Sequence, residues 1–101
     1  MPVELRGSVA KAISRGLNSG QLAMGLARVD FIHKKFAQAD RRYDEIIREH
    51  SNTPVAPEAI YWKWVSRYKN TNDHTVLGEA AKELKQYGDS LWAKKASIWA
   101  T

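Results

Sequence analysis

The chain has 101 residues, no cysteine and a net charge of +5, from 16 basic and 11 acidic side chains. This length suits one small domain with a modest core. The absence of cysteine excludes disulfides, thiolate metal sites and cysteine nucleophiles. The first residues lack the apolar run of a secretory signal, and no stretch approaches the ~18 apolar residues of a membrane span. We therefore expect no membrane span and, from the chain as given, a cytoplasmic location. A periplasmic or envelope location would apply if the chain is a fragment of a longer protein.

Apolar residues recur at helical spacing along nearly the whole chain, and no stretch alternates for long enough to form a strand. The sequence therefore predicts an all-α fold of antiparallel helical hairpins. In chain order, helices are expected over about 5–17, 19–34, 36–50, 58–69, 74–87 and 90–99. Breaks between them are indicated by glycine-rich, proline-rich or cap-forming stretches at 16–20, 51–57, 70–73 and 88–90. The resulting division is an N-terminal helix (1–18), a first hairpin (19–54), a second hairpin (55–88) and a capping helix (89–101).

A ten-residue pattern recurs at 50–59 and 87–96, a separation of 37 positions, with identical residues at Ala56 and Ala93 and at Ala59 and Ala96. Each copy ends one amphipathic stretch and opens the next. Repetition with this period is typical of stacked helical hairpins, because one hairpin cannot bury its apolar face alone. The copies differ, since Pro54 and Pro57 of the first are replaced by Leu91 and Lys94 in the second.

The ordered apolar and aromatic residues of both hairpins resemble the tetratricopeptide repeat family, in its bacterial form. In the first hairpin the matching positions are Leu26, Ala27, Phe31, Phe36, Ala39 and Tyr43, followed by the 50–59 phrase. In the second they are Ala59 to Trp62, Tyr68 and Tyr87 to Ser90. The resemblance covers about residues 21–99 and implies a right-handed stack of about two repeats with flanking helices.

The second hairpin departs from that pattern at two positions. Trp64 stands where the family has glycine, and Ala80 stands where it has a bulky aromatic residue. We expect the indole to fill the volume of the missing ring, which would keep the core densely packed. The alternative is an exposed Trp64 and a splayed second hairpin.

The resemblance implies a non-catalytic module that binds a protein or peptide along the concave surface lined by the first helix of each pair. Besides Phe31, Ile32, Glu58 and Tyr68, it places Gln21, Met24, Arg28, Tyr61, Val65 and Lys69 on that surface. Arg28, Lys35 and Lys69 could donate charged hydrogen bonds to an acidic peptide or a chain terminus. The candidate partner-binding residues are therefore Gln21, Met24, Arg28, Lys35, Tyr61, Val65 and Lys69.

Two other functions stay open. Trp92 and Trp99 are seven residues apart, so a terminal helix could offer both to a second copy of the chain, unless it packs back on its own neighbour. The basic composition and four tryptophans are compatible with nucleic-acid binding, although the charge is dispersed and matches no recognition motif.

A second resemblance concerns the end of the chain. Tyr68-Lys69, Asn72 to His74 and the stretch from Ser90 to Ala100 are similar to the helical region that follows a thioredoxin-like domain in some bacterial proteins. This similarity implies a place beside a redox or envelope partner.

Catalytic and metal chemistry find little support in the sequence. His33, His50 and His74 lack zinc-helix spacing, the serines lack a nucleophile elbow, and no glycine-rich phosphate loop occurs. We expect no enzymatic activity, no cofactor and no metal.

Overall fold

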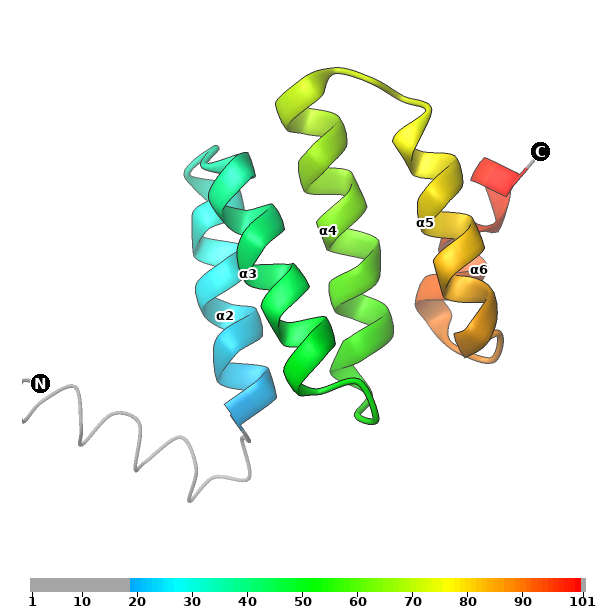
Figure 1. The fold of residues 1–101 in the computed structure, drawn as a ribbon, viewed down its shortest axis with the longest axis horizontal. Coiled ribbons are helices and arrows are strands. Elements are labelled where there is room, and N and C mark those ends of the chain that lie inside the picture. Colours follow the sequence, from blue (N-terminus) through cyan, green and yellow to red (C-terminus); the bar gives the residue numbers. More distant parts are fainter. Residues whose placement is uncertain (1–18, 101) are drawn as a thin grey trace, which may run out of the picture.

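The structure, a computed structural model, describes residues 19–100, so the expected N-terminal helix lies outside the described part. The helices are α2 (Ser19–Ile32), α3 (Phe36–Glu49), α4 (Val55–Thr71), α5 (Val76–Leu84) and α6 (Leu91–Ala96), with 3₁₀ turns η1 (Lys85–Tyr87) and η2 (Ser97–Ala100). Residues 19–100 contain no strand, which confirms the all-α class for that part. Figure 1 shows α2, α3, α4 and α5 side by side with alternating directions, and α6 beside α5.

Most expected helices are present, with shifted ends. The largest shift at a helix start is in α4, which begins at Val55, three residues before the expected position 58. Pro57 is then the third helical residue, where its missing N–H costs nothing because the first-turn N–H groups have no helical partner. The expected helix 74–87 is shorter, since α5 ends at Leu84 and continues as η1. Its start is delayed because the side chain of Asp73 accepts hydrogen bonds from the N–H and the hydroxyl of Thr75, at 3.0 and 2.6 Å.

The buried residues form two clusters. The first cluster lies among α2, α3 and the start of α4 and consists of Met24, Ala27, Ala39, Tyr43, Ile46, Val55 and Ala59. The second lies among α4, α5 and α6 and consists of Ile60, Trp64, Ala80, Ala81, Leu84 and Ala96. Ile47 packs against both, so the two clusters are continuous through α3.

Trp64 is 9% exposed and shares the second cluster with Ala80, whose exposure is zero. The expectation that the indole is buried beside the small residue is therefore confirmed, and the alternative of an exposed Trp64 is wrong. The indole Nε1 is buried and has no hydrogen-bond partner among residues 19–100.

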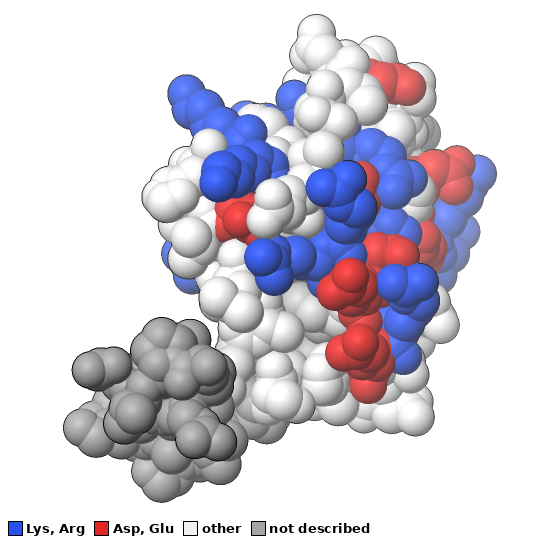
Figure 2. All heavy atoms as spheres, turned by 60° about the vertical axis from the view of Figure 1, so that its left-hand side comes forward, with Lys and Arg blue, Asp and Glu red and all other residues white. Residues whose placement is uncertain are grey.

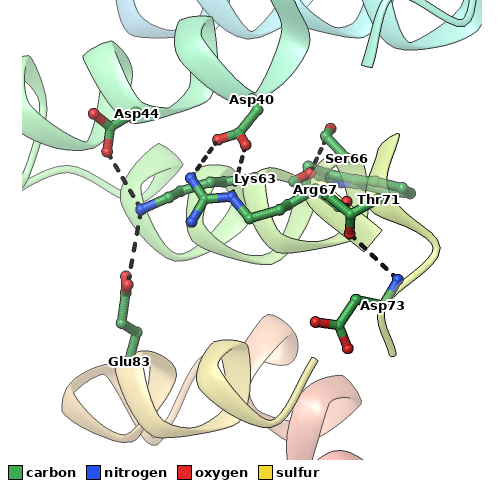
Figure 3. Close-up of polar contacts among 9 residues, drawn as sticks. Asp40, Asp44, Lys63, Ser66, Arg67, Thr71, Asp73 and Glu83 are labelled. Carbon is green, nitrogen blue, oxygen red and sulfur yellow. Dashed lines mark hydrogen bonds and ion pairs between the residues drawn. The ribbon is translucent and has the colours of Figure 1, made fainter. Parts of the chain in front are cut away.

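An ionic network joins α4 to both neighbouring helices (Figure 3). Arg67 donates two hydrogen bonds to Asp40 of α3, from Nε at 2.8 Å and from Nη2 at 3.1 Å. Lys63 Nζ lies 3.3 Å from Asp44 of α3 and 3.8 Å from Glu83 of α5. Hydrogen bonding to the Asp40 carboxylate raises the pKa of Arg67, which keeps its charge at every ordinary pH. These contacts hold the two hairpins together along one face of α4.

The two copies of the repeated phrase also touch. The hydroxyl of Tyr87, the first residue of the second copy, donates a hydrogen bond of 3.1 Å to the carbonyl of Ser51 in the first. The second copy begins α6 with a side-chain cap, because Ser90 Oγ accepts from the N–H of Ala93 at 3.0 Å. Pro54, which precedes α4 in the first copy, makes no such cap.

Candidate functional site

An open hollow of about 390 Å³ lies among α2, α3, α4 and α6. Its lining residues are Met24, Arg28, Phe31, Ile32, Tyr43, Glu58, Trp62 and Trp92, and we call it the aromatic hollow. The volume falls within the range of sites that hold small molecules or single side chains. Four separate helices contribute to it, so it exists only when both hairpins and α6 are in place.

One side of the hollow is a wall of rings. Phe31 of α2 and Trp62 of α4 meet edge to face, with centroids 5.3 Å apart and planes at 70°. Trp62 and Trp92 of α6 are 6.2 Å apart at 61°. Behind this wall Tyr61 contacts Trp92 at 5.1 Å and stacks on Trp99 at 5.3 Å. Mutual ring contacts of this kind hold the wall in one shape before a ligand arrives.

The rest of the lining includes a polar corner formed by Arg28, Tyr43 and Glu58. Tyr43 is 2% exposed, and its hydroxyl makes no hydrogen bond to another described residue. Burial raises the pKa of Tyr43 to about 12, the Glu58 charge adds to the rise, and Arg28 opposes it. Burial also raises the pKa of the Glu58 carboxyl above its ordinary 4.5, again opposed by Arg28. Within residues 19–100, Glu58 and Arg28 form no ion pair at or below 4.0 Å.

The helical period of α4 explains why the hollow and the ionic network do not interfere. Successive residues are rotated by about 100° around a helix axis. Glu58, Trp62 and Val65 therefore fall on one side of α4, and Lys63 and Arg67 fall on the opposite side. The same helix presents an aromatic face to the hollow and a charged face to Asp40 and Asp44.

The structure brings some of the expected partner-binding residues together and leaves others apart. Met24 and Arg28 line the hollow. Tyr61 belongs to the ring cluster behind the wall, and Val65 is half-buried on the same side of α4. Gln21 near the start of α2, Lys35 in the α2–α3 turn and Lys69 in the last turn of α4 are exposed and do not line the hollow.

Three lining residues are not among those expected on the concave partner-binding surface. Trp62 and Tyr43 were assigned to the helical framework, and Trp92 was assigned to the terminal helix. A signal for Trp62 was available, because it follows Glu58 by four residues and so shares its side of the helix. Nothing in the sequence indicates that Trp92, thirty residues further on, lies beside Trp62.

The terminal segment packs against its own chain. Trp92 and Trp99 are half-buried, and both contact Tyr61 of α4. Two large apolar side chains of the segment, Leu91 and Ile98, are nevertheless 59% and 73% exposed.

Charge is interspersed on the described surface. Figure 2 shows basic and acidic side chains side by side on the face that it presents. Within the described part of the chain, Arg42, Arg48, Lys63, Arg67 and Lys82 each lie in an ion pair with an acidic side chain. This distribution does not form the uniform basic stripe that is typical of a nucleic-acid interface.

Residues 19–100 contain no cluster of three or more His, Asp or Glu side chains that could bind a metal ion. Among the helices of the same residues, none has the length and apolar character that a bilayer crossing requires.

Comparison of the chain with protein-family models, curated proteins and solved structures finds no match.

Proposed function

We propose that this chain is a non-catalytic protein-interaction module of the tetratricopeptide-repeat type, which binds a peptide segment of a protein partner in the aromatic hollow. The observation that supports this proposal most directly is the composition of the hollow. Three large rings, the side chain of Tyr43 and two opposite charges converge there. Aromatic and arginine side chains around a desolvated pocket are typical of the residues that dominate binding energy at protein interfaces.

A selection from a displayed library of random peptides tests the proposal. We expect peptides that bind the wild type and bind Arg28→Ala at least ~10-fold more weakly, since charged hydrogen bonds would be lost. Arg41→Ala is the matched control, because Arg41 is also exposed, on α3, but does not line the hollow. Equal binding to the wild type and Arg28→Ala, or no enriched peptide, would contradict the proposal.

Self-association is the second candidate, supported by the exposure of Leu91 and Ile98. If these side chains form a dimer contact, sedimentation of the wild type will shift with concentration and that of Leu91→Gln with Ile98→Gln will not. A wild type that stays monomeric up to high concentration would remove this candidate.

A further inference from the structure

We infer that the aromatic hollow selects an uncharged aromatic or aliphatic side chain of the bound peptide, and that Arg28 and Glu58 hold the main-chain amide beside it. This inference rests on the proposed peptide-binding function and specifies the chemistry of the segment that binds.

The wall explains the preference for an apolar side chain. Phe31, Trp62 and Trp92 present ring surface to the hollow, and Met24 and Ile32 extend it with aliphatic surface. Ile32 is 62% exposed, so part of this apolar surface is left in contact with water. An inserted ring or branched aliphatic group would remove the wall and itself from water together.

The polar corner disfavours a charged side chain of either sign. A cation in the hollow would be attracted by Glu58 and repelled by Arg28, and an anion would experience the reverse. A second positive group opposes a cation, because Lys95 Nζ already lies 4.8 Å from the centre of the Trp92 ring. Stacking of a lysine or arginine on the wall would therefore add a third positive charge to the site.

A peptide amide suits the same corner, because it offers one donor and one acceptor without net charge. Its N–H can donate to the Glu58 carboxylate, which makes no hydrogen bond within residues 19–100. Its carbonyl can accept from the Arg28 guanidinium or from the Tyr43 hydroxyl, which also lacks a partner among these residues. An uncharged amide can thus form hydrogen bonds with both the acceptor Glu58 and a donor, Arg28 or Tyr43, whereas a charged group would be attracted by one of the two charges and repelled by the other.

Three blocked amino acids serve as probes of this inference: the N-acetyl methylamides of phenylalanine, lysine and glutamate. Binding is followed by the indole N–H signals of the four tryptophans in two-dimensional NMR. Trp62 and Trp92 line the hollow, whereas Trp64 and Trp99 do not and act as internal controls. We expect the phenylalanine probe to shift the first pair selectively, with a Kd at least ~10-fold below those of the other two probes.

The variants Glu58→Gln and Arg28→Gln test the polar corner separately. Each is expected to weaken binding of the phenylalanine probe by roughly 3- to 10-fold, which corresponds to the net contribution of one typical hydrogen bond. Arg41→Gln is the matched control and should leave the Kd unchanged. Unchanged affinity in both corner variants would overturn the assignment of the amide.

The outcomes also separate this inference from the proposed function. If displayed peptides bind through the hollow but insert a basic or acidic side chain, the inference is wrong and the peptide-binding function stands. A lysine or glutamate probe that binds as tightly as the phenylalanine probe would likewise contradict the inference and leave the peptide-binding function intact. If neither probes nor peptides shift Trp62 and Trp92, both are wrong.

Discussion

The two core clusters place a large ring and a small residue at equivalent positions, but in opposite order. In the first cluster Ala27 of α2 packs with Tyr43 of α3; in the second, 37 positions later, Trp64 of α4 packs with Ala80 of α5. Each hairpin therefore pairs one ring with one alanine, and only the helix that supplies the ring changes. The repeat therefore determines which positions pack together, whereas the large and the small residue at those positions can be exchanged between the two helices of a hairpin.

The exchange also determines which hairpin contributes its core ring to the aromatic hollow. Tyr43 comes from the second helix of its hairpin and lines the aromatic hollow. Trp64 comes from the first helix and does not line the hollow, and its ring instead lies beneath two cations, Lys63 and Arg67, each 4.7 Å from the ring centre. The first hairpin thus contributes to a binding surface with its core ring, and the second uses its core ring only for packing.

The largest effect is expected from a substitution in the second cluster. Trp64→Ala would leave a cavity beside Ala80 and lower the free energy of unfolding by roughly 3 to 5 kcal/mol. If the Trp64 ring fills the space that the small Ala80 leaves, the double variant Trp64→Ala with Ala80→Phe should recover part of that loss. Urea titration measures both values. A loss below about 1 kcal/mol in the single variant would show that the ring contributes little to packing.

A second prediction concerns the buried phenol of the first cluster. The folded state keeps the Tyr43 proton up to pH about 12, whereas the unfolded chain loses it near the ordinary value of 10.0. The unfolded state therefore binds fewer protons in this window, and stability falls as pH rises from about 10 to 12. The fall attributable to Tyr43 is at most roughly 2 to 3 kcal/mol, since each pKa unit corresponds to about 1.4 kcal/mol.

Tyr43→Phe should lack this part of the pH dependence. The measurement is the difference in unfolding free energy between the wild type and Tyr43→Phe at pH 8, 10, 11 and 12. We expect a constant difference below pH 10 and a growing relative advantage of the variant above it. Parallel curves over the whole range would contradict a buried phenol.

A smaller effect is expected where the hairpins are joined by charge. Arg67→Met removes both hydrogen bonds to Asp40, a side chain that is only 16% exposed, and should cost about 1 to 3 kcal/mol. Arg48→Met is the matched control, since Arg48 is 69% exposed and lies 3.9 Å from Asp44, and it should cost less than about 0.5 kcal/mol. Equal losses in a thermal or urea titration would mean that the Asp40 contact is no stronger than a surface pair.

The smallest effect distinguishes the two copies of the repeated phrase. Ser90→Ala removes the cap of α6 and should cost about 1 kcal/mol. It should also broaden the Trp92 signal, because α6 positions that ring. The neighbouring exposed Asp89 makes no cap contact, so Asp89→Ala is the control and should change stability by no more than about 0.5 kcal/mol. An unchanged Trp92 signal in Ser90→Ala would show that the cap of α6 does not affect the position of Trp92 in the hollow.

Features that depend on neighbouring residues could be predicted from the sequence. The apolar spacing and the breaks at 51–57 and 70–73 located α3 and α4 within a few residues. Comparison of the two hairpins also predicted the burial of Trp64 beside Ala80, because a missing ring leaves a volume that another must fill.

The hollow could be predicted only in part, because it depends on helices that are distant in the sequence. Met24 and Arg28 follow from the face of one helix, but the contact of Trp92 with Trp62 depends on how α6 returns toward α4. Lys35 is predicted from its charge alone, and Lys69 from its charge and from its place in the family's pattern. The charge of a side chain does not determine where in the fold it lies, and both lysines lie at helix ends away from the hollow.

The hydrogen bond from Tyr87 to Ser51 has a mechanical consequence. It ties the end of the second hairpin to the linker that precedes it, across 36 positions of the chain. Any opening of α5 and α6 away from α3 must break this bond first, and an exposed bond of this kind stabilises by only about 1 kcal/mol. At one end of the helices this bond therefore adds a weaker contact between successive hairpins to the ionic network on α4, and Tyr87→Phe would remove it without changing that network.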